Sequence, residues 1–131
     1  MKILIVEDEK NIVLSLRMLL SKLGYEVLCV DNGVEALEIS RSFKPDLILL
    51  DIILPGIDGY LVCQAMREEQ ETAKIPIVFI SAMSREEDLK RAYQAGASDY
   101  LIKPFTPEKI KKTLEKYLKG GLSDEKNSDC R

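Results

Sequence analysis

The chain of 131 residues has the length of a single domain, and its 46% hydrophobic and 31% charged residues are typical of a folded globular protein. The 19 basic and 22 acidic residues leave a net charge of −3, which argues against a nucleic-acid-binding protein. The sequence has no histidine, which excludes histidine-dependent nucleophilic catalysis, histidine-ligated zinc and a phosphohistidine donor.

Neither a membrane segment nor a secretion signal is expected. No stretch reaches the ~18 apolar residues that span a bilayer. The apolar start, residues 2–6, runs directly into three acidic residues and is too short for a signal peptide. The three cysteines form no Cys-x-x-Cys pair: Cys29, Cys63 and Cys130. We therefore expect a cytoplasmic protein with reduced thiols, of which Cys29 and Cys63 are buried.

Five short apolar segments are predicted as strands: residues 2–6, 26–31, 46–50, 75–81 and 99–103. The third and fourth contain continuous apolar runs, Leu47-Ile48-Leu49-Leu50 and Ile77-Val78-Phe79-Ile80, with no alternation of polar residues. Such runs are typical of parallel strands that are covered by helices on both faces.

The segments between these strands have the spacing and the end signals of helices. The first ends at Gly24 and has one apolar stripe: Ile12, Leu16, Leu19, Leu20 and Leu23. The second is expected at residues 34–43, after Asn32-Gly33. The third begins near Asp58, and its predicted apolar side contains Leu61, Ala65 and Met66.

The last two predicted helices have recognisable start signals. Ser84 and Glu87 have the spacing of a capping box, and Gly96 is expected to end the fourth helix. Thr106 is the predicted N-cap of the fifth helix, which ends before Gly120. We expect one domain over residues 1–119 and a polar C-terminal tail over residues 120–131.

Strict alternation of five strands with five helices predicts an α/β fold, a doubly wound parallel sheet with right-handed crossovers. Such sheets bind their ligands at the carboxyl ends of the strands. Polar side chains occur at four of these ends: Glu7 and Asp8, Asp51, Ser81, and Lys103.

These residue types together indicate phosphoryl transfer. Three carboxylates that converge on one rim repel one another unless a cation lies among them, and oxygen ligands suit Mg²⁺. Lys103 would then hold an anion, and the Ser81 hydroxyl would donate to it. Carboxylates, Mg²⁺, an ammonium and a hydroxyl make up a phosphoryl-transfer site.

The same residues lie in motifs that resemble the receiver domain of two-component response regulators, over residues 2–119. The motifs are Val6-Glu7-Asp8, residues 50–59, Ile80-Ser81-Ala82, residues 96–100, and Lys103-Pro104-Phe105. The resemblance implies the flavodoxin-like receiver fold of the chemotaxis regulator, a five-stranded sheet in the order 2-1-3-4-5 with five helices.

The resemblance also implies a role for each residue of the rim. Asp51 would be the phosphoacceptor, and Lys103 would pair with the phosphoryl oxygens. Ser81 occupies the hydroxyl switch position and Tyr100 the aromatic one. The Lys103–Pro104 peptide is expected to be cis.

A set of metal ligands follows from the same resemblance. Asp8, Asp51 and the backbone carbonyl of Ile53 would bind Mg²⁺ directly, and Glu7 would act through water. Many relatives have methionine where this chain has Ile53, but a backbone ligand does not depend on the side chain.

The implied function is a phosphorylation-dependent switch and not an enzyme. The donor would be a sensor histidine kinase or a histidine phosphotransfer protein. Phosphorylation would draw Ser81 toward the phosphoryl group and turn Tyr100 inward. The face made by the fourth helix, fifth strand and fifth helix would then bind a downstream protein effector, or a second copy in a homodimer. We expect no direct contact with nucleic acid and no membrane insertion.

Other interpretations fit parts of the sequence. A phosphohydrolase of the haloacid-dehalogenase type also uses Asp, Mg²⁺, Ser and Lys, but has Asp-x-Asp after its first strand, whereas Asp51 belongs to the third. A flavodoxin needs a phosphate-binding loop where Glu7-Asp8-Glu9 would repel a phosphate. A pseudo-receiver that only binds partners would not need Asp51 and Lys103. The chain is either a stand-alone regulator or part of a longer protein.

Overall fold

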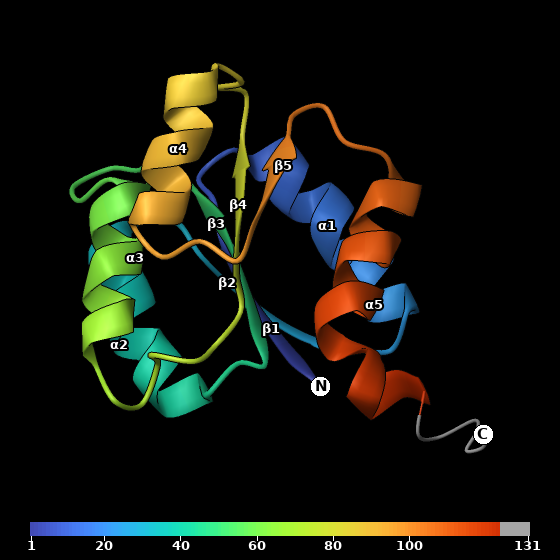
Figure 1. The fold of residues 1–131 in the computed structure, drawn as a ribbon. Coiled ribbons are helices and arrows are strands. Elements are labelled where there is room, and N and C mark those ends of the chain that lie inside the picture. The colour runs from blue at the N-terminus through green and yellow to red at the C-terminus, as the bar shows by residue number, and fades with distance from the viewer. Residues whose placement is uncertain (124–131) are drawn as a thin grey trace.

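The computed structural model describes the backbone of residues 1–123 and the side chains of residues 1–118. Strands and helices alternate along the chain (Figure 1). The strands are β1 (Lys2–Val6), β2 (Glu26–Val30), β3 (Leu47–Asp51), β4 (Ile77–Ser81) and β5 (Asp99–Ile102). The helices are α1 (Lys10–Lys22), α2 (Gly33–Phe43), α3 (Gly59–Glu68), α4 (Glu86–Gln94) and α5 (Pro107–Ser123). The predicted alternation is confirmed, and every strand boundary lies within two residues of its prediction.

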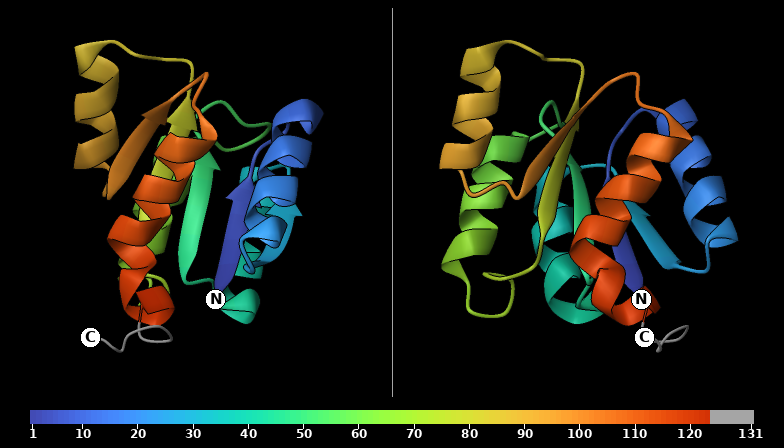
Figure 2. Two further views of the ribbon diagram at one scale, coloured as in Figure 1. Left: turned by 90° about the vertical axis from the view of Figure 1, so that its right-hand side faces the viewer. Right: turned by 45° about the vertical axis from the view of Figure 1, so that its right-hand side comes forward.

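All strands are parallel, in the order β2-β1-β3-β4-β5. Helices α1 and α5 cover one face of the sheet, and α2, α3 and α4 cover the other (Figures 1 and 2). The doubly wound α/β fold and the strand order are therefore confirmed.

The central strands are buried on both faces, and their side chains alternate between two apolar layers. In β3, Ile48 and Leu50 pack in the layer under α2, α3 and α4, whereas Leu47 and Leu49 pack in the layer under α1 and α5. This double burial explains the continuous apolar sequence of the strand. Burial of each such leucine contributes about 1.5–3 kcal/mol of stability.

Side chains cap the starts of three helices, and of these the Thr106 cap was predicted. The side chain of Asn32 accepts from Glu35 N at 2.9 Å at the start of α2. At the start of α3, Asp58 accepts from Leu61 N at 3.0 Å. Thr106 accepts from Lys109 N at 3.1 Å at the start of α5.

The start of α4 and the end of α5 differ from their predictions. The N-cap of α4 is Arg85, whose backbone N donates to the Asp88 carboxylate at 3.2 Å, so the capping pair lies one position beyond Ser84 and Glu87. Helix α5 continues through Gly120 to Ser123, because glycine weakens a helix by about 1 kcal/mol but does not forbid it. The rest of the predicted tail, with Cys130, lies outside the described residues.

The buried face of α3 was predicted only in part, since Met66 is buried as expected and Leu61 is not. Leu61 is 50% exposed, and the buried side chains of this helix are Tyr60, Val62, Cys63 and Met66. Positions 59, 62, 63 and 66 form one helical stripe, which excludes Leu61 and Ala65. Cys63 is buried as expected, and its burial raises the pKa of the thiol to about 11, whereas Cys29 is only half-buried. No helix within the described residues is long and apolar enough to cross a membrane.

Candidate functional site

The carboxyl ends of β1, β3, β4 and β5 bring the predicted rim residues together. The sheet register pairs Val6 with Leu50 and Asp51 with Ile80, so the ends of these strands are level. Asp51 is the last residue of β3, not the first residue after it. The pairing of β3 with its neighbouring strands therefore fixes the backbone of Asp51, and with it the position from which the side chain extends.

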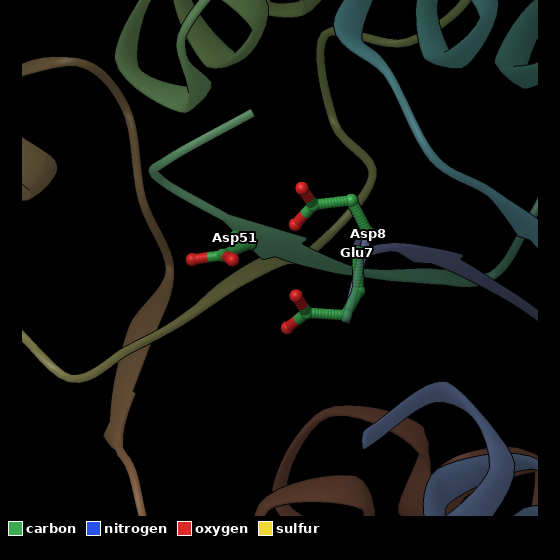
Figure 3. A group of neighbouring side chains, drawn as sticks. All are labelled: Glu7, Asp8 and Asp51. Carbon is green, nitrogen blue, oxygen red and sulfur yellow. The ribbon is translucent and has the colours of Figure 1, made fainter. Parts of the chain in front are cut away.

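Three carboxylates converge at this edge (Figure 3). Glu7, Asp8 and Asp51 each offer an oxygen that lies within 4.8 Å of the other two. Glu7 is 1% exposed and Asp51 is 5% exposed, whereas Asp8 is open to solvent. Anions this close repel one another strongly, and a bound cation would remove that repulsion.

Within residues 1–118, Lys103 is the cation that contacts this cluster. Its Nζ lies 2.9 Å from Glu7 Oε1, 3.1 Å from Glu9 Oε1 and 3.4 Å from Asp51 Oδ2. Burial lowers the pKa of Lys103, but the carboxylates of Glu7, Asp51 and Glu9 raise it by more, so the net pKa is above its ordinary value. Lys103 therefore stays charged and neutralises part of the cluster.

Glu9 was not predicted to contact the site. The signal for it was present, since Glu9 is the third acid of the run that starts at Glu7. Its side chain is 63% exposed and reaches Lys103, which lies 94 residues away along the chain. Glu9 thus helps to hold the ammonium beside Asp51.

Glu7 is the least satisfied group of the site. Its Oε2 accepts from Glu9 N at 3.1 Å, whereas Oε1 lies 2.9 Å from the Lys103 ammonium and makes no hydrogen bond within the described part of the chain. Burial raises the pKa of Glu7 to about 7, against the opposing effects of Lys103 and the Glu9 N–H. Glu7, Asp8 and Asp51 offer oxygen ligands only, and the single charge of Lys103 does not balance three carboxylates, which fits a hard cation such as Mg²⁺.

The raised pKa of Glu7 predicts a pH effect on stability in the absence of metal. The pKa of this carboxyl is about 7 in the folded protein, against an ordinary value of 4.5. The folded state therefore binds the proton more tightly, and its contribution to stability, complete below pH 4.5, is lost as the pH rises through 7. We expect the free energy of unfolding in urea and EDTA to fall over this range. The Glu7→Gln variant should show a smaller fall, and equal slopes would contradict the assignment.

Ser81 and Tyr100 meet at the backbone of Met83. The buried Ser81 Oγ accepts from Met83 N at 3.1 Å, and the Tyr100 hydroxyl donates to the Met83 carbonyl at 2.7 Å. Tyr100 is 9% exposed, and its ring centroid lies 6.2 Å from that of Phe79. The ring was expected to turn inward on phosphorylation; the structure places it inward, bonded to the loop after β4.

The remaining predicted features lie beside these residues. The Lys103–Pro104 peptide is cis, as expected. Lys103 N donates to the Ser81 carbonyl at 2.8 Å, which ties the end of β5 to the end of β4. The side chain of Ile53 is 66% exposed, and a role for its carbonyl as a metal ligand stays a prediction.

Comparison with known proteins decides the family. The sequence profile of the response regulator receiver domain matches residues 3–115. The chain belongs to the response regulator receiver family. Its fold, its motifs and its place in two-component signalling are those of a receiver, which is a signalling domain and not a classical enzyme.

Two relatives show the range of receiver proteins. The transcriptional regulatory protein PhoP of Bacillus subtilis, for alkaline phosphatase synthesis, is 39% identical over 118 residues, which are 90% of this chain and 48% of PhoP. PilH of Pseudomonas aeruginosa is 34% identical over 119 residues, which are 91% of this chain and 98% of PilH. The chain thus spans about half the length of PhoP and similar relatives, but nearly the whole of PilH.

A solved receiver structure bears on the metal. The receiver domain of the sensor histidine kinase PA1611 from Pseudomonas aeruginosa has a TM-score of 0.83 to this structure at 32% identity, over 88% of this chain and 95% of that one. That structure holds a magnesium ion in its active-site cleft. In this receiver, the cluster of Glu7, Asp8 and Asp51 could hold a metal ion.

Proposed function

We propose that this receiver is a cytoplasmic phosphorylation switch whose phosphoacceptor is Asp51. The observation that carries the proposal is the setting of this carboxylate. Asp51 is buried at the end of β3, 3.4 Å from the Lys103 ammonium and within 4.8 Å of two further carboxylates. The 131 residues contain no histidine, so the phosphohistidine donor lies outside them, in a sensor histidine kinase or a histidine phosphotransfer protein.

In the transfer, an oxygen of Asp51 attacks phosphorus and the bond from phosphorus to the donor nitrogen breaks. The electron pair of that bond stays on the imidazole, so no further co-reactant is needed. Lys103 pairs with the phosphoryl oxygens and offsets their charge, from a position that the carboxylates of Glu7 and Glu9 already fix.

The residues present would hold one Mg²⁺. Asp8 and Asp51 would be the direct side-chain ligands, the carbonyl of Ile53 would be the backbone ligand, and Glu7 would act through water. When bound, the ion supplies positive charge beside the transferring group. The convergence of three carboxylate oxygens within 4.8 Å of one another supports this assignment.

The signal leaves the site through Ser81 and Tyr100. Both are bonded to the backbone of Met83, so a shift of the Ser81 hydroxyl toward a phosphoryl group would change the loop that leads into α4. The face of α4, β5 and α5 would then change its affinity for a downstream protein effector or a second copy. Tyr93 and Ile102, at 47% and 41% exposure, offer apolar surface on this face.

Labelling by a small-molecule phosphodonor tests the proposal. We expect acetyl phosphate with Mg²⁺ to give one phosphoryl group that hydroxylamine removes, since hydroxylamine cleaves acyl phosphates. EDTA should prevent the labelling. An enzyme of the haloacid-dehalogenase type would instead release phosphate from p-nitrophenyl phosphate over many turnovers. Such turnover, without a hydroxylamine-sensitive label, would contradict the proposal.

A further inference from the structure

Helix α3 begins in direct contact with the strand that carries Asp51. A Cβ on Gly59, the first residue of α3, would overlap the carbonyl oxygen of Asp51 and would lie 2.7 Å from Cα of Ile52. Gly59 N also donates to the Ile52 carbonyl at 2.7 Å. With no side chain between them, a backbone movement at the end of β3 must move the first turn of α3.

The next residue, Tyr60, connects this turn to α4. Its side chain is buried, with 4% exposure, and its hydroxyl donates to the backbone carbonyl of Asp88 at 3.3 Å. The guanidinium carbon of Arg91 lies 4.2 Å from the centre of the Tyr60 ring. Both contacts are to α4. One is a hydrogen bond and the other a cation–π contact, and the strength of each depends on how the two groups are oriented.

These contacts are separate from those of Tyr100. Tyr60 holds the first turn of α4 through Asp88, whereas Tyr100 holds the preceding loop through Met83. Both rings lie beside the ring of one residue, Phe79, with centroid distances of 5.8 Å for Tyr60 and 6.2 Å for Tyr100. Two tyrosines from different elements thus bind different backbone carbonyls, Tyr60 that of Asp88 in α4 and Tyr100 that of Met83 in the loop before α4.

We infer that Tyr60 is a positioning residue that couples the state of Asp51 to α4, by a route through Gly59 that does not use Ser81 or Tyr100. The inference rests on the proposed function, because the phosphoryl group on Asp51 is what would shift the end of β3. Tyr60 acts through α4 and does not touch the phosphoryl group. Since coupling between two sites is reciprocal, a change at Tyr60 must alter the affinity of a phosphoryl mimic at Asp51.

Beryllofluoride with Mg²⁺, bound to the full chain, tests the coupling. The Tyr60→Phe variant keeps the ring but cannot form the hydrogen bond to Asp88. A shift of α4 in the variant therefore no longer costs the free energy of that bond. We expect this variant to bind beryllofluoride about threefold more tightly, a factor that a single neutral hydrogen bond can supply. Hydrogen exchange of amides 86–94 should be faster in the free variant and should change less on binding.

A second variant and a control complete the test. Arg91→Met removes the cation that lies over the Tyr60 ring and should shift the affinity for beryllofluoride in the same direction as Tyr60→Phe. Tyr25→Phe alters a buried tyrosine in the opposite core layer and should behave as wild type. A structural role alone would lower the melting temperature without changing the affinity.

The outcomes separate this inference from the proposed function. If wild-type protein binds beryllofluoride and both variants match it in affinity and in α4 exchange, the inference is wrong and the proposed function stands. If wild-type protein does not bind beryllofluoride at all, the proposed function is wrong, and the coupling falls with it.

Discussion

Replacement of Asp51 by asparagine is expected to abolish phosphorylation. The amide keeps the size of the side chain but is not an anionic nucleophile, so it cannot form the acyl phosphate. Asp51 is buried among two other carboxylates, and removal of its charge relieves part of their repulsion. The variant should therefore be at least as stable as wild type in EDTA, as measured by thermal unfolding.

The matched control for Asp51→Asn is Asp31→Asn. Asp31 is an exposed acid that directly follows β2, at the same edge of the sheet but outside the carboxylate cluster. The Asp31→Asn variant loses the same charge, and acetyl phosphate should label it to the same extent as the wild-type protein. A label on the Asp51→Asn protein, mapped to another residue, would contradict the assignment of the phosphoacceptor.

Replacement of Lys103 by alanine should have the second largest effect, on both transfer and stability. Hydrogen bonds to charged groups contribute ~1.5–3 kcal/mol, so we expect phosphorylation to slow by about ten- to a hundredfold. The variant also leaves the buried carboxylate of Glu7 without its cation, and removal of one partner of a buried pair typically costs ~3–5 kcal/mol. Protonation of Glu7, whose pKa is already about 7, limits that cost.

Two further variants make the Lys103→Ala result specific. Lys10→Ala removes an exposed lysine near Glu7 and Asp8 and should leave the rate and the free energy of unfolding unchanged. In a Glu7→Gln background, Lys103→Ala should lose less stability than in wild type, because only one buried carboxylate, Asp51, is then left without its cation instead of two. A wild-type phosphorylation rate in Lys103→Ala would show that Lys103 has no part in transfer.

The sequence was sufficient to predict the layers of the fold and most of the site. Helical and strand periodicity are local signals, and parallel strands with helical crossovers bring the residues at the strand ends to one edge. Asp51 and Lys103 could therefore be placed together, although 52 residues separate them. The receiver motifs supplied the strand order, which periodicity does not contain.

What the sequence did not predict depends on packing between elements. The contact of Glu9 with Lys103 joins two loops, and the contacts of Tyr60 with α4 depend on how two helices lie on the sheet. Leu61 was predicted on the buried side of α3, whereas the structure buries Val62 and Cys63 beside Met66. Which side chains of a helix are buried depends on the shape of the core and not only on the local pattern of apolar residues.

The most direct test of the central claim is to trap the phosphoryl group on the wild-type protein. Borohydride reduces an aspartyl phosphate to homoserine, and peptide mass spectrometry then locates the modified residue. After treatment with acetyl phosphate and Mg²⁺, the account predicts homoserine at position 51 and unmodified aspartate at position 8. Homoserine at another position, or a borohydride-resistant phosphoester on Ser81, would contradict it.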